Sequence, residues 1–306
     1  MSTISIRNLS KSYGPVAALS EFSIDIEKGS VFGLLGPNGA GKTTAFKCML
    51  GLARPNHGEV LYDGAPLEAR TFERIGYIPE RSVLYDWMTL GEHLEMQRRA
   101  FSRFNVGRAK ELLTLFSLDP RKRVRALSKG MRTAAAVVLA FAVEPDILIL
   151  DEPTTGLDPV NQRAVLKLMI DASAQGKTIL FSSHQIGQVE RAAETIAILL
   201  DGKLLLEGAV DDLKSGWKIV EGIFDSDQFS IDGLGADPGV RRIERTGRIL
   251  RVSVRSDSDN VANRITQLGA RDVRTLDLNL EDIFLGAVDP SANLEQGAIV
   301  QNREQN

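Results

Sequence analysis

The chain has 306 residues, enough for one large hydrophobic core and one small one. Its 37 basic and 40 acidic side chains give a formal net charge of -3, so the sequence lacks the strongly basic balance that is typical of nucleic-acid-binding domains. The single cysteine, Cys48, excludes an intramolecular disulfide, which fits a reducing compartment, and its apolar helical surroundings predict a small buried side chain. No apolar run reaches the roughly 20 residues that a membrane-spanning helix needs, so we expect any membrane part to come from another polypeptide.

The first 215 or so residues alternate short β-rich segments with helical patterns, which predicts an α/β fold. The predicted strands are residues 3–8, 22–26, 31–35, 59–62, 75–78, 147–150 and 178–181. Helices are expected over residues 42–50, most of 90–116, from near 128 onwards, and 160–174. Residues 196–200 and 203–207 predict a hairpin, because the dipeptide Asp201-Gly202 between them favours the positive φ of a tight turn.

The pattern changes near Ser215 and Gly216. The strands predicted after this point are residues 218–224, 240–245, 249–255 and 272–276, and the helices are 259–268 and 280–285. These elements predict a small α+β domain over residues 216–288. Residues 289–306 are polar and poor in apolar side chains, which predicts a disordered tail.

A glycine-rich segment follows the buried strand predicted at residues 31–35. It matches the pattern G-x-x-x-x-G-K-[ST] with Gly36, Pro37, Asn38, Gly39, Ala40, Gly41, Lys42 and Thr43. Glycines let backbone N–H groups turn inward around phosphates, and the following helix adds the positive end of its dipole. The motif predicts a nucleotide site in which Lys42 binds the β- and γ-phosphates, Thr43 ligates Mg²⁺ and Thr44 lies beside them. The alternative is a glycine-rich turn that binds no ligand.

Two carboxylates follow the buried strand predicted at residues 147–150. Asp151 is in the position where a carboxylate can hold Mg²⁺ through water, and Glu152 can orient or deprotonate an attacking water. Acidic residues commonly end strands, so the pair indicates a catalytic site only in combination with the glycine-rich segment upstream. Together the two motifs predict an ATP-hydrolysing enzyme.

At this point residues 3 to about 215 resemble the nucleotide-binding subunit of ABC transporters. Tyr13 resembles the aromatic residue that stacks on adenine, although a tyrosine packing at a strand end is the alternative. Residues 127–131, LSKGM, resemble the family signature LSGGQ, and residues 151–159 match the family's Walker B and D-loop run. His184 matches the switch histidine near the γ-phosphate.

The resemblance implies a P-loop NTPase fold of the ABC ATPase type, with a mixed sheet, covering helices and an α-helical subdomain at about residues 87–140. It also implies that two such domains, identical or paralogous, meet head to tail with ATP and Mg²⁺ between them. Ser128 and Gly130 of one domain would close over the phosphates bound by the other, and Asp158 counts among the nucleotide-binding residues. Catalysis would fall to Glu152, His184 and Lys42, and hydrolysis would open the dimer.

The sequence departs from the family pattern at two places. The residue that is usually a metal-contacting glutamine is Glu80, which can still ligate Mg²⁺ but adds a negative charge near the triphosphate. In the signature, Lys129 and Met131 replace the usual Gly and Gln. A subunit with impaired hydrolysis is therefore an alternative, opposed by the presence of both Asp151 and Glu152.

Residues 278–285 resemble the terminal segment of ATP-binding subunits from ABC-2-type exporters. The chain is therefore interpreted as the ATPase subunit of an exporter that drives a separate integral membrane permease from the cytoplasmic face of the membrane. The C-terminal domain is interpreted as a dimerisation or regulatory extension. The alternative is a soluble ABC ATPase that acts on nucleic acid or the ribosome. Such relatives usually carry two ATP-binding domains or a long coiled-coil insertion, which this sequence lacks, so no nucleic-acid partner is expected.

Overall fold

The computed structural model of the chain describes residues 2–81 and 83–288, and the predicted tail at 289–306 lies outside them. The chain forms two compact units that divide between Glu207 and Gly208. The sequence placed this change near residue 215, because it did not predict the short helix α8 (Val210–Ser215). This helix packs against α10 (Leu280–Val288) and so belongs to the second unit.

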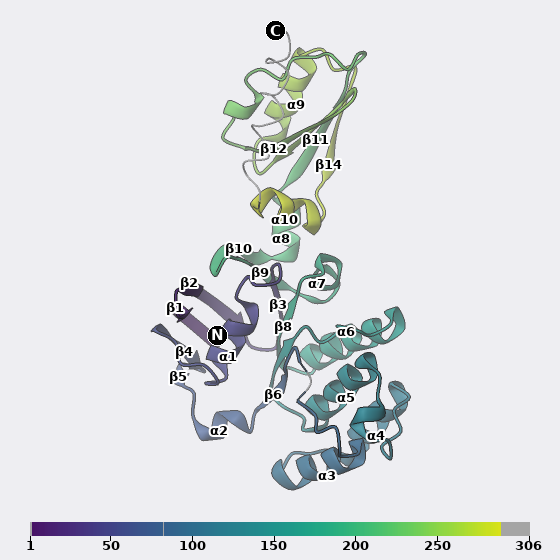
Figure 1. Cartoon of the computed structure of the whole chain (residues 1–306). Helices are drawn as coiled ribbons and strands as arrows, with labels where there is room; N and C mark the ends of the chain where they lie inside the picture. The colour runs from purple at the N-terminus through teal and green to yellow at the C-terminus, as the bar shows by residue number, and fades with distance from the viewer. Residues whose placement is uncertain (1, 82, 289–306) are drawn as a thin grey trace. The chain divides into compact units, whose positions relative to one another are not determined.

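A six-stranded sheet, in the order β10-β9-β3-β8-β7-β6, forms the centre of the first unit (Figure 1). Its strands are β3 (Val31–Leu35), β6 (Ile75–Ile78), β7 (Ile147–Asp151), β8 (Thr178–Ser183), β9 (Thr195–Leu200) and β10 (Lys203–Ala209). Every residue of β3, β7 and β8 is buried, as expected for parallel strands that are covered on both faces. The predicted hairpin between β9 and β10 is confirmed, with φ values of 47° at Asp201 and 77° at Gly202.

An antiparallel sheet in the order β2-β1-β4-β5 lies beside it, with α1 (Lys42–Met49) packed between the two sheets. Its strands are β1 (Ser2–Tyr13), β2 (Val16–Glu27), β4 (His57–Tyr62) and β5 (Ala65–Pro66). Strands β1 and β2 are longer than the sequence predicted. The β1–β2 pairing shifts register at four places, and each shift breaks the alternation that a sequence pattern relies on.

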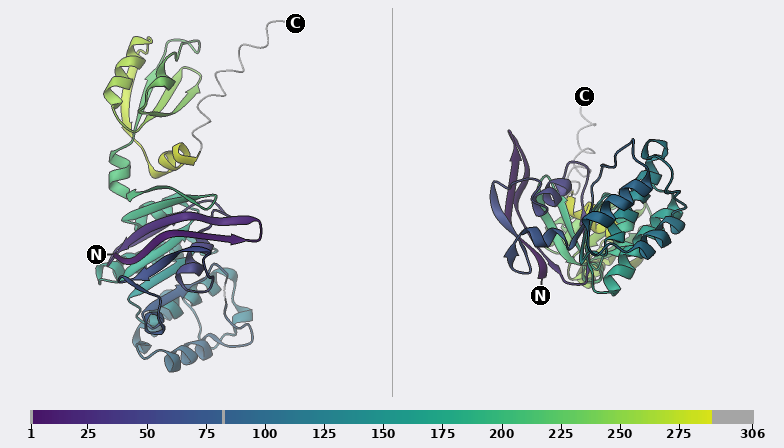
Figure 2. Two further views of the ribbon diagram at one scale, coloured as in Figure 1. Left: turned by 90° about the vertical axis from the view of Figure 1, so that its left-hand side faces the viewer. Right: turned by 90° about the horizontal axis from the view of Figure 1, so that it is seen from below.

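Helices cover the far side of the six-stranded sheet, as the view from below in Figure 2 shows. The helices in contact with this sheet are α5 (Lys129–Ala142), α6 (Pro159–Ala174) and α7 (Ile186–Ala192), while α3 (Leu90–Ala100) and α4 (Val106–Leu115) pack against α5. The shorter α2 (Ala69–Phe72) and the 3₁₀ turn Val124–Ala126 complete the helical elements described in this unit. The helical stretch predicted over residues 90–116 is two helices, because Asn105 accepts a hydrogen bond from the Arg108 N–H and so starts α4 anew. Within the described residues, no helix combines the length and the apolar character that a membrane crossing requires.

The second unit is a four-stranded antiparallel sheet in the order β12-β13-β11-β14, covered on one face by α9 (Ser258–Gln267). Its strands are β11 (Lys218–Ile223), β12 (Val240–Thr246), β13 (Ile249–Val254) and β14 (Asp272–Asp277), and a 3₁₀ turn spans Leu234–Ala236. Val220, Val252 and Ile265 are fully buried in its core. The expected α/β core with a small α+β unit at the C-terminal end is confirmed.

The thiol of Cys48 tests the packing of α1 between the sheets. Cys48 is 5% exposed, and burial raises the pKa of its thiol, so less thiolate is present at a given pH than in an exposed cysteine. We expect a thiol reagent to label the folded chain at less than about a hundredth of the rate in denaturant, because labelling requires opening of the core. The absorbance of the released thiolate product measures this rate. Fast labelling of the folded chain would show that α1 is loosely packed.

Candidate functional site

The loop between β3 and α1 is a tight turn that only glycine permits at several positions. Gly39 and Gly41 have φ values of 86° and 109°, a region that side chains with a Cβ rarely enter. A Cβ on Gly36 would lie 2.3 Å from the Leu199 carbonyl oxygen, and one on Gly41 would lie 2.4 Å from that of Ala18. The glycines of the predicted motif therefore allow the loop to curl closely against β2 and β9.

The ammonium group of Lys42 is folded back over this loop. Its Nζ donates hydrogen bonds to the carbonyl oxygens of Gly36 at 2.7 Å and Pro37 at 3.1 Å, and the residue is 6% exposed. Nζ also lies 3.6 Å from Glu152 Oε1. The loop thus holds a buried positive charge, which is an environment suited to phosphate.

A cavity of about 370 Å³ opens in front of this loop. Its lining combines the loop, the end of β6 and the end of β7: Ala18, Asn38, Gly39, Ala40, Gly41, Lys42, Thr43, Thr44, Glu80, Asp151 and Glu152. Most of the residues that the sequence proposed for nucleotide and metal binding therefore meet in one place. Burial, with the nearby carboxylates of Asp151 and Glu80, raises the pKa of Tyr77 in β6 to about 12.

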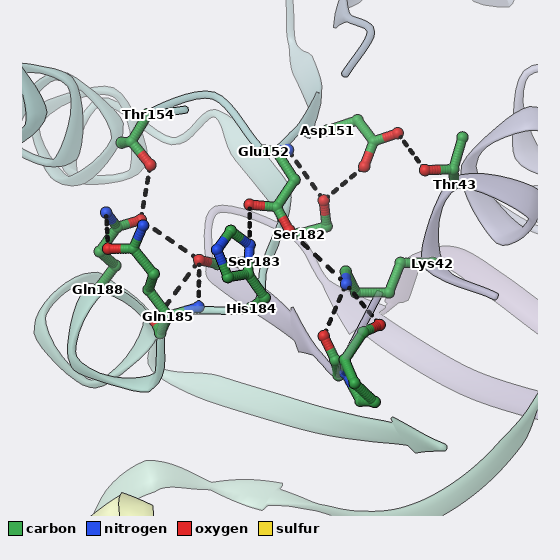
Figure 3. Close-up of polar contacts among 12 residues, drawn as sticks. Lys42, Thr43, Asp151, Glu152, Thr154, Ser182, Ser183, His184, Gln185 and Gln188 are labelled. Atoms are coloured by element: carbon green, nitrogen blue, oxygen red, sulfur yellow. Dashed lines mark hydrogen bonds and ion pairs between the residues drawn. The ribbon is translucent and has the colours of Figure 1, made fainter. Parts of the chain in front are cut away.

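Asp151, at the end of β7, is hydrogen-bonded to the start of α1 and to the end of the neighbouring strand β8 (Figure 3). Its Oδ2 accepts a hydrogen bond from the Thr43 hydroxyl at 2.7 Å, and its Oδ1 accepts one from the Ser182 hydroxyl at 2.6 Å. Asp151 is 1% exposed. A buried carboxylate needs such partners, and both hydroxyls come from segments that the sheet brings to its carboxyl edge.

Glu152 and His184 form a contact at the edge of the cavity (Figure 3). His184 Nδ1 lies 2.9 Å from Glu152 Oε2; since an ionised carboxylate only accepts hydrogen bonds, this contact requires a proton on Nδ1. Among the described residues, nothing donates a hydrogen bond to the other oxygen, Oε1, although it is buried. Glu152 has a φ of 52°, a left-handed conformation that costs a non-glycine residue about 1–3 kcal/mol. A strained backbone and a buried carboxylate oxygen without a donor are typical of a reactive group.

The residues of the cavity fit a nucleotide triphosphate with Mg²⁺. A Cβ-free cradle and Lys42 suit phosphate oxygens, and the Thr43 hydroxyl with the carboxylates of Asp151 and Glu80 are the oxygen ligands that Mg²⁺ prefers. In the described part of the chain, no three or more histidine, cysteine or carboxylate side chains cluster tightly enough to hold a metal ion. Mg²⁺ characteristically binds through one or two carboxylates, water and substrate phosphate, so this donor set is sufficient.

Tyr13, a predicted adenine contact, is the last residue of β1. Its side chain is 49% exposed, and Lys11 Nζ lies 5.0 Å from the centre of its ring. It does not belong to the described lining of the cavity. Its stacking role therefore stays a prediction.

The predicted residues Ser128, Gly130 and Asp158 also lie outside the described lining of the cavity. Ser128 accepts a hydrogen bond from the Met131 N–H at 3.2 Å and so caps α5. A Cβ on Gly130 would lie 2.4 Å from the Gly156 carbonyl oxygen, so α5 begins directly against the loop that follows Glu152. Within one chain these residues shape helix starts, and their nucleotide contacts stay predictions.

Asp158 caps α6 by accepting hydrogen bonds from the N–H groups of Asn161 at 3.0 Å and Val160 at 2.9 Å. These bonds, the one from Asn161 first, lower the pKa of its carboxyl. The carboxylate is thus fully engaged in starting a helix.

Three polar residues next to the site were given no role by the sequence analysis: Ser182, Thr154 and Gln188. Ser182 lies two residues before His184 at the end of β8, and the structure shows that this strand pairs with β7, which ends at Asp151. The Thr154 hydroxyl donates to Gln188 Oε1 at 2.6 Å. No local pattern marks Gln188 as part of the site, because Thr154, the partner that connects it to the loop after Glu152, lies 34 positions away in the sequence.

A protein-family model described as "ABC transporter" matches residues 19–155, and one described as "AAA domain, putative AbiEii toxin, Type IV TA system" matches residues 122–189. The chain is 31% identical over 285 residues to "ABC transporter ATP-binding protein YtrB" of Bacillus subtilis (strain 168), which covers 92% of this chain and 97% of the relative. It is 32% identical over 297 residues to "Nod factor export ATP-binding protein I" of Rhizobium etli, covering 93% of each chain. A solved structure described as "Structure of ATP binding subunit of ABC transporter" superposes with a TM-score of 0.64 at 32% identity, covering 70% of this chain and 92% of that one.

The similarity to YtrB runs through nearly all of that protein, and the cavity holds the glycine-rich loop, Lys42, Thr43 and the two carboxylates in one place. Together these findings identify the family: the chain belongs to the ATP-binding proteins of ABC transporters.

Proposed function

We propose that this chain is the ATP-hydrolysing subunit of an ABC exporter and that it drives a separate membrane permease. The observation that carries the proposal is the cavity in which Lys42, Thr43, Asp151 and Glu152 converge, with His184 hydrogen-bonded to Glu152. A structural glycine turn needs no convergent carboxylates, and a nucleotide-binding module without hydrolysis needs no buried carboxylate oxygen free of donors.

The side chains of the cavity take distinct roles in this proposal. Lys42 would donate hydrogen bonds to the phosphate oxygens, either in place of or in addition to its bonds to the Gly36 and Pro37 carbonyl oxygens. Thr43, Asp151 and Glu80 would hold Mg²⁺. Bound Mg²⁺ supplies positive charge to the phosphate oxygens. Glu152 accepts the proton of the attacking water through its carboxylate, and His184 keeps that carboxylate oriented through Oε2. Glu152 and His184 both directly follow strands that end at the carboxyl edge of the sheet.

The proposal includes a composite site between two subunits. Ser128 and Lys129 are exposed at the start of α5, so the helix N-terminus can offer N–H groups to a nucleotide held by another copy. The Thr133 hydroxyl donates to the Thr155 carbonyl oxygen at 2.9 Å, which fastens this helix start to the loop following Glu152. In this proposal, the movement of the α5 start that accompanies dimer closure is therefore transmitted to the loop that follows Glu152.

ATP turnover against protein concentration tests hydrolysis at a composite site. We expect the rate per subunit to rise with concentration, because each chain supplies only half of each site. Glu152→Gln removes the proton acceptor while keeping the shape, and should lower kcat by about a hundredfold or more while ATP still binds. Phosphate release and nucleotide binding are the two measurements. Wild-type turnover in Glu152→Gln would contradict the assignment.

Glu80 offers a separate test of the metal site. Its carboxylate is expected to strengthen Mg²⁺ binding, so Glu80→Gln should raise the Mg²⁺ concentration for half-maximal turnover by about tenfold, comparable to losing a supporting group of a metal site. Turnover at saturating Mg²⁺ should persist. An unchanged Mg²⁺ titration and an unchanged rate would show that Glu80 does not act on the metal.

Export through a permease is supported by relatives and by the surface of the first unit. The Nod factor export relatives align over more than nine-tenths of this chain, including the C-terminal unit. An open groove of about 1210 Å³ along α3 is lined in part by exposed Tyr85, Trp87 and Met96. Exposed aromatic and methionine side chains are enriched at protein interfaces. A permease bound here would place the chain peripherally at the cytoplasmic face of the membrane.

Trp87 and Tyr85 test this surface, since their rings lie 5.5 Å apart and are 68% and 52% exposed. In chains co-expressed with a candidate membrane permease, Trp87→Ala and Tyr85→Ala should weaken co-purification by about tenfold or more, as truncation of aromatic interface residues commonly does. Basal ATPase activity of the isolated chain should stay unchanged. Leu115→Ala, at an exposed apolar residue of α4, is the matched control. Equal recovery of permease with all three variants would place the docking surface elsewhere.

A further inference from the structure

We propose that Ser182 and Gln188 are positioning residues that hold Glu152 and His184 in contact. The proposal rests on the proposed ATPase function, in which this pair handles the attacking water. Neither residue belongs to the described lining of the cavity, so both would act through their hydrogen bonds to the loops that carry the pair. Figure 3 shows the two connections on either side of the Glu152–His184 contact.

Ser182 connects the end of β8 to the end of β7. Its hydroxyl donates to Asp151 Oδ1 at 2.6 Å and accepts the Glu152 N–H at 2.9 Å, and the side chain is fully buried. One hydroxyl therefore orients the Asp151 carboxylate and fixes the peptide that leads into Glu152. The left-handed φ of Glu152 is not a conformation that its own side chain favours, so it has to be maintained by such outside contacts.

Gln188 makes the second connection, from the first turns of α7. Its Oε1 accepts hydrogen bonds from the Thr154 hydroxyl at 2.6 Å and the Ser183 hydroxyl at 3.3 Å. Its Nε2 donates to Gln185 Oε1 at 2.9 Å. Thr154 follows Glu152 by two residues and Ser183 directly precedes His184, so a single amide oxygen joins the two loops.

The two connections constrain the same contact from opposite ends. Ser182 holds the backbone N–H of Glu152. Gln188 joins Thr154, in the loop after Glu152, to Ser183, the residue directly before His184. Gln188 is 6% exposed and Thr154 is 2% exposed, so water cannot readily replace the lost partner when one side chain is removed. The 2.9 Å distance between His184 Nδ1 and Glu152 Oε2 is then a consequence of buried bonds outside the cavity.

The mildest test uses Thr154→Val and Gln188→Leu, which remove the hydrogen bonds at nearly constant volume, in the full-length chain. We expect kcat to fall about ten- to hundredfold while the dissociation constant for ATP changes by less than about twofold, because a small displacement of a catalytic group affects the reaction rather than binding. The double variant should be no worse than Gln188→Leu alone, since Gln188→Leu already removes the bond between Thr154 and Gln188 that Thr154→Val breaks. Ser182→Ala should lower kcat further and raise the Mg²⁺ requirement through Asp151.

Two buried hydroxyls away from the cavity provide matched controls. Thr178 Oγ1 accepts the Gly29 N–H at 3.0 Å, and the Ser173 hydroxyl donates to the Gly29 carbonyl oxygen at 2.8 Å. Thr178→Val and Ser173→Ala lose a comparable buried bond, so they should lower the melting temperature without lowering kcat. A fall in kcat that simply follows the melting temperature across all variants and controls would overturn the proposal.

A second readout does not depend on turnover. The chain has only three histidines, so ¹⁵N signals of His184 can be assigned by comparison with His57→Gln and His93→Gln. The wild type should show the Nδ1-protonated tautomer at His184, and Thr154→Val or Gln188→Leu should shift the signals towards a mixture of tautomers. Unchanged signals and unchanged kcat in folded variants would overturn the positioning role. If Glu152→Gln kept wild-type turnover, the proposed function would be wrong, and the tautomer signals alone would decide whether the positioning stands.

Discussion

The parallel pairing of β7 with β8, and of β8 with β3, is the constraint on which the site depends. Asp151 lies opposite Ser182 in the first pairing, and Leu35 lies opposite Ser183 in the second. Because parallel strands end at the same edge, the segments that follow them converge there with their polar groups. The three strands are buried throughout, so burial of their side chains opposes any other register.

That edge concentrates charge that has little access to water. Lys42, Asp151 and Glu152 are each less than 9% exposed, and a buried charge is tolerated only when partners compensate it. Asp151 is compensated by two hydroxyls, whereas Glu152 has a histidine at one oxygen and only the more distant Lys42 at the other. This difference supports the proposal that the two adjacent carboxylates serve different purposes, Asp151 in a fixed geometry and Glu152 with an oxygen available to the attacking water.

The second unit has a hydrophobic core of its own. Val220, Val252 and Ile265 pack between its sheet and α9, and α8 packs against α10 at the other end of the same unit. Its similarity to the Nod factor export relatives is part of an alignment that spans most of the chain. Its interpretation as a dimerisation or regulatory extension stays a prediction, since none of these contacts shows what it binds.

The sequence by itself determined the elements that depend on local pattern. The buried runs of β3, β7 and β8, the Asp201-Gly202 turn and the glycine-rich loop were all predictable, because hydrophobic periodicity and glycine conformation act within a few residues. Lys42, Thr43, Asp151 and Glu80 were likewise named from motifs and resemblance, and the structure places them around one cavity. The lengths of β1 and β2 were not predictable, since their register shifts arise from pairing between strands.

Only the tertiary structure decided which polar groups hold the site together. The bonds from Ser182 to Asp151 and from Thr154 to Gln188 join residues 31 and 34 positions apart, and no local pattern records either of them. The left-handed backbone of Glu152 is likewise a property of the loop's surroundings, because glutamate has no intrinsic preference for it. Local chemistry determined which residues are present at the carboxyl edge of the sheet, and the packing of distant strands determined how far apart they lie and which way they point.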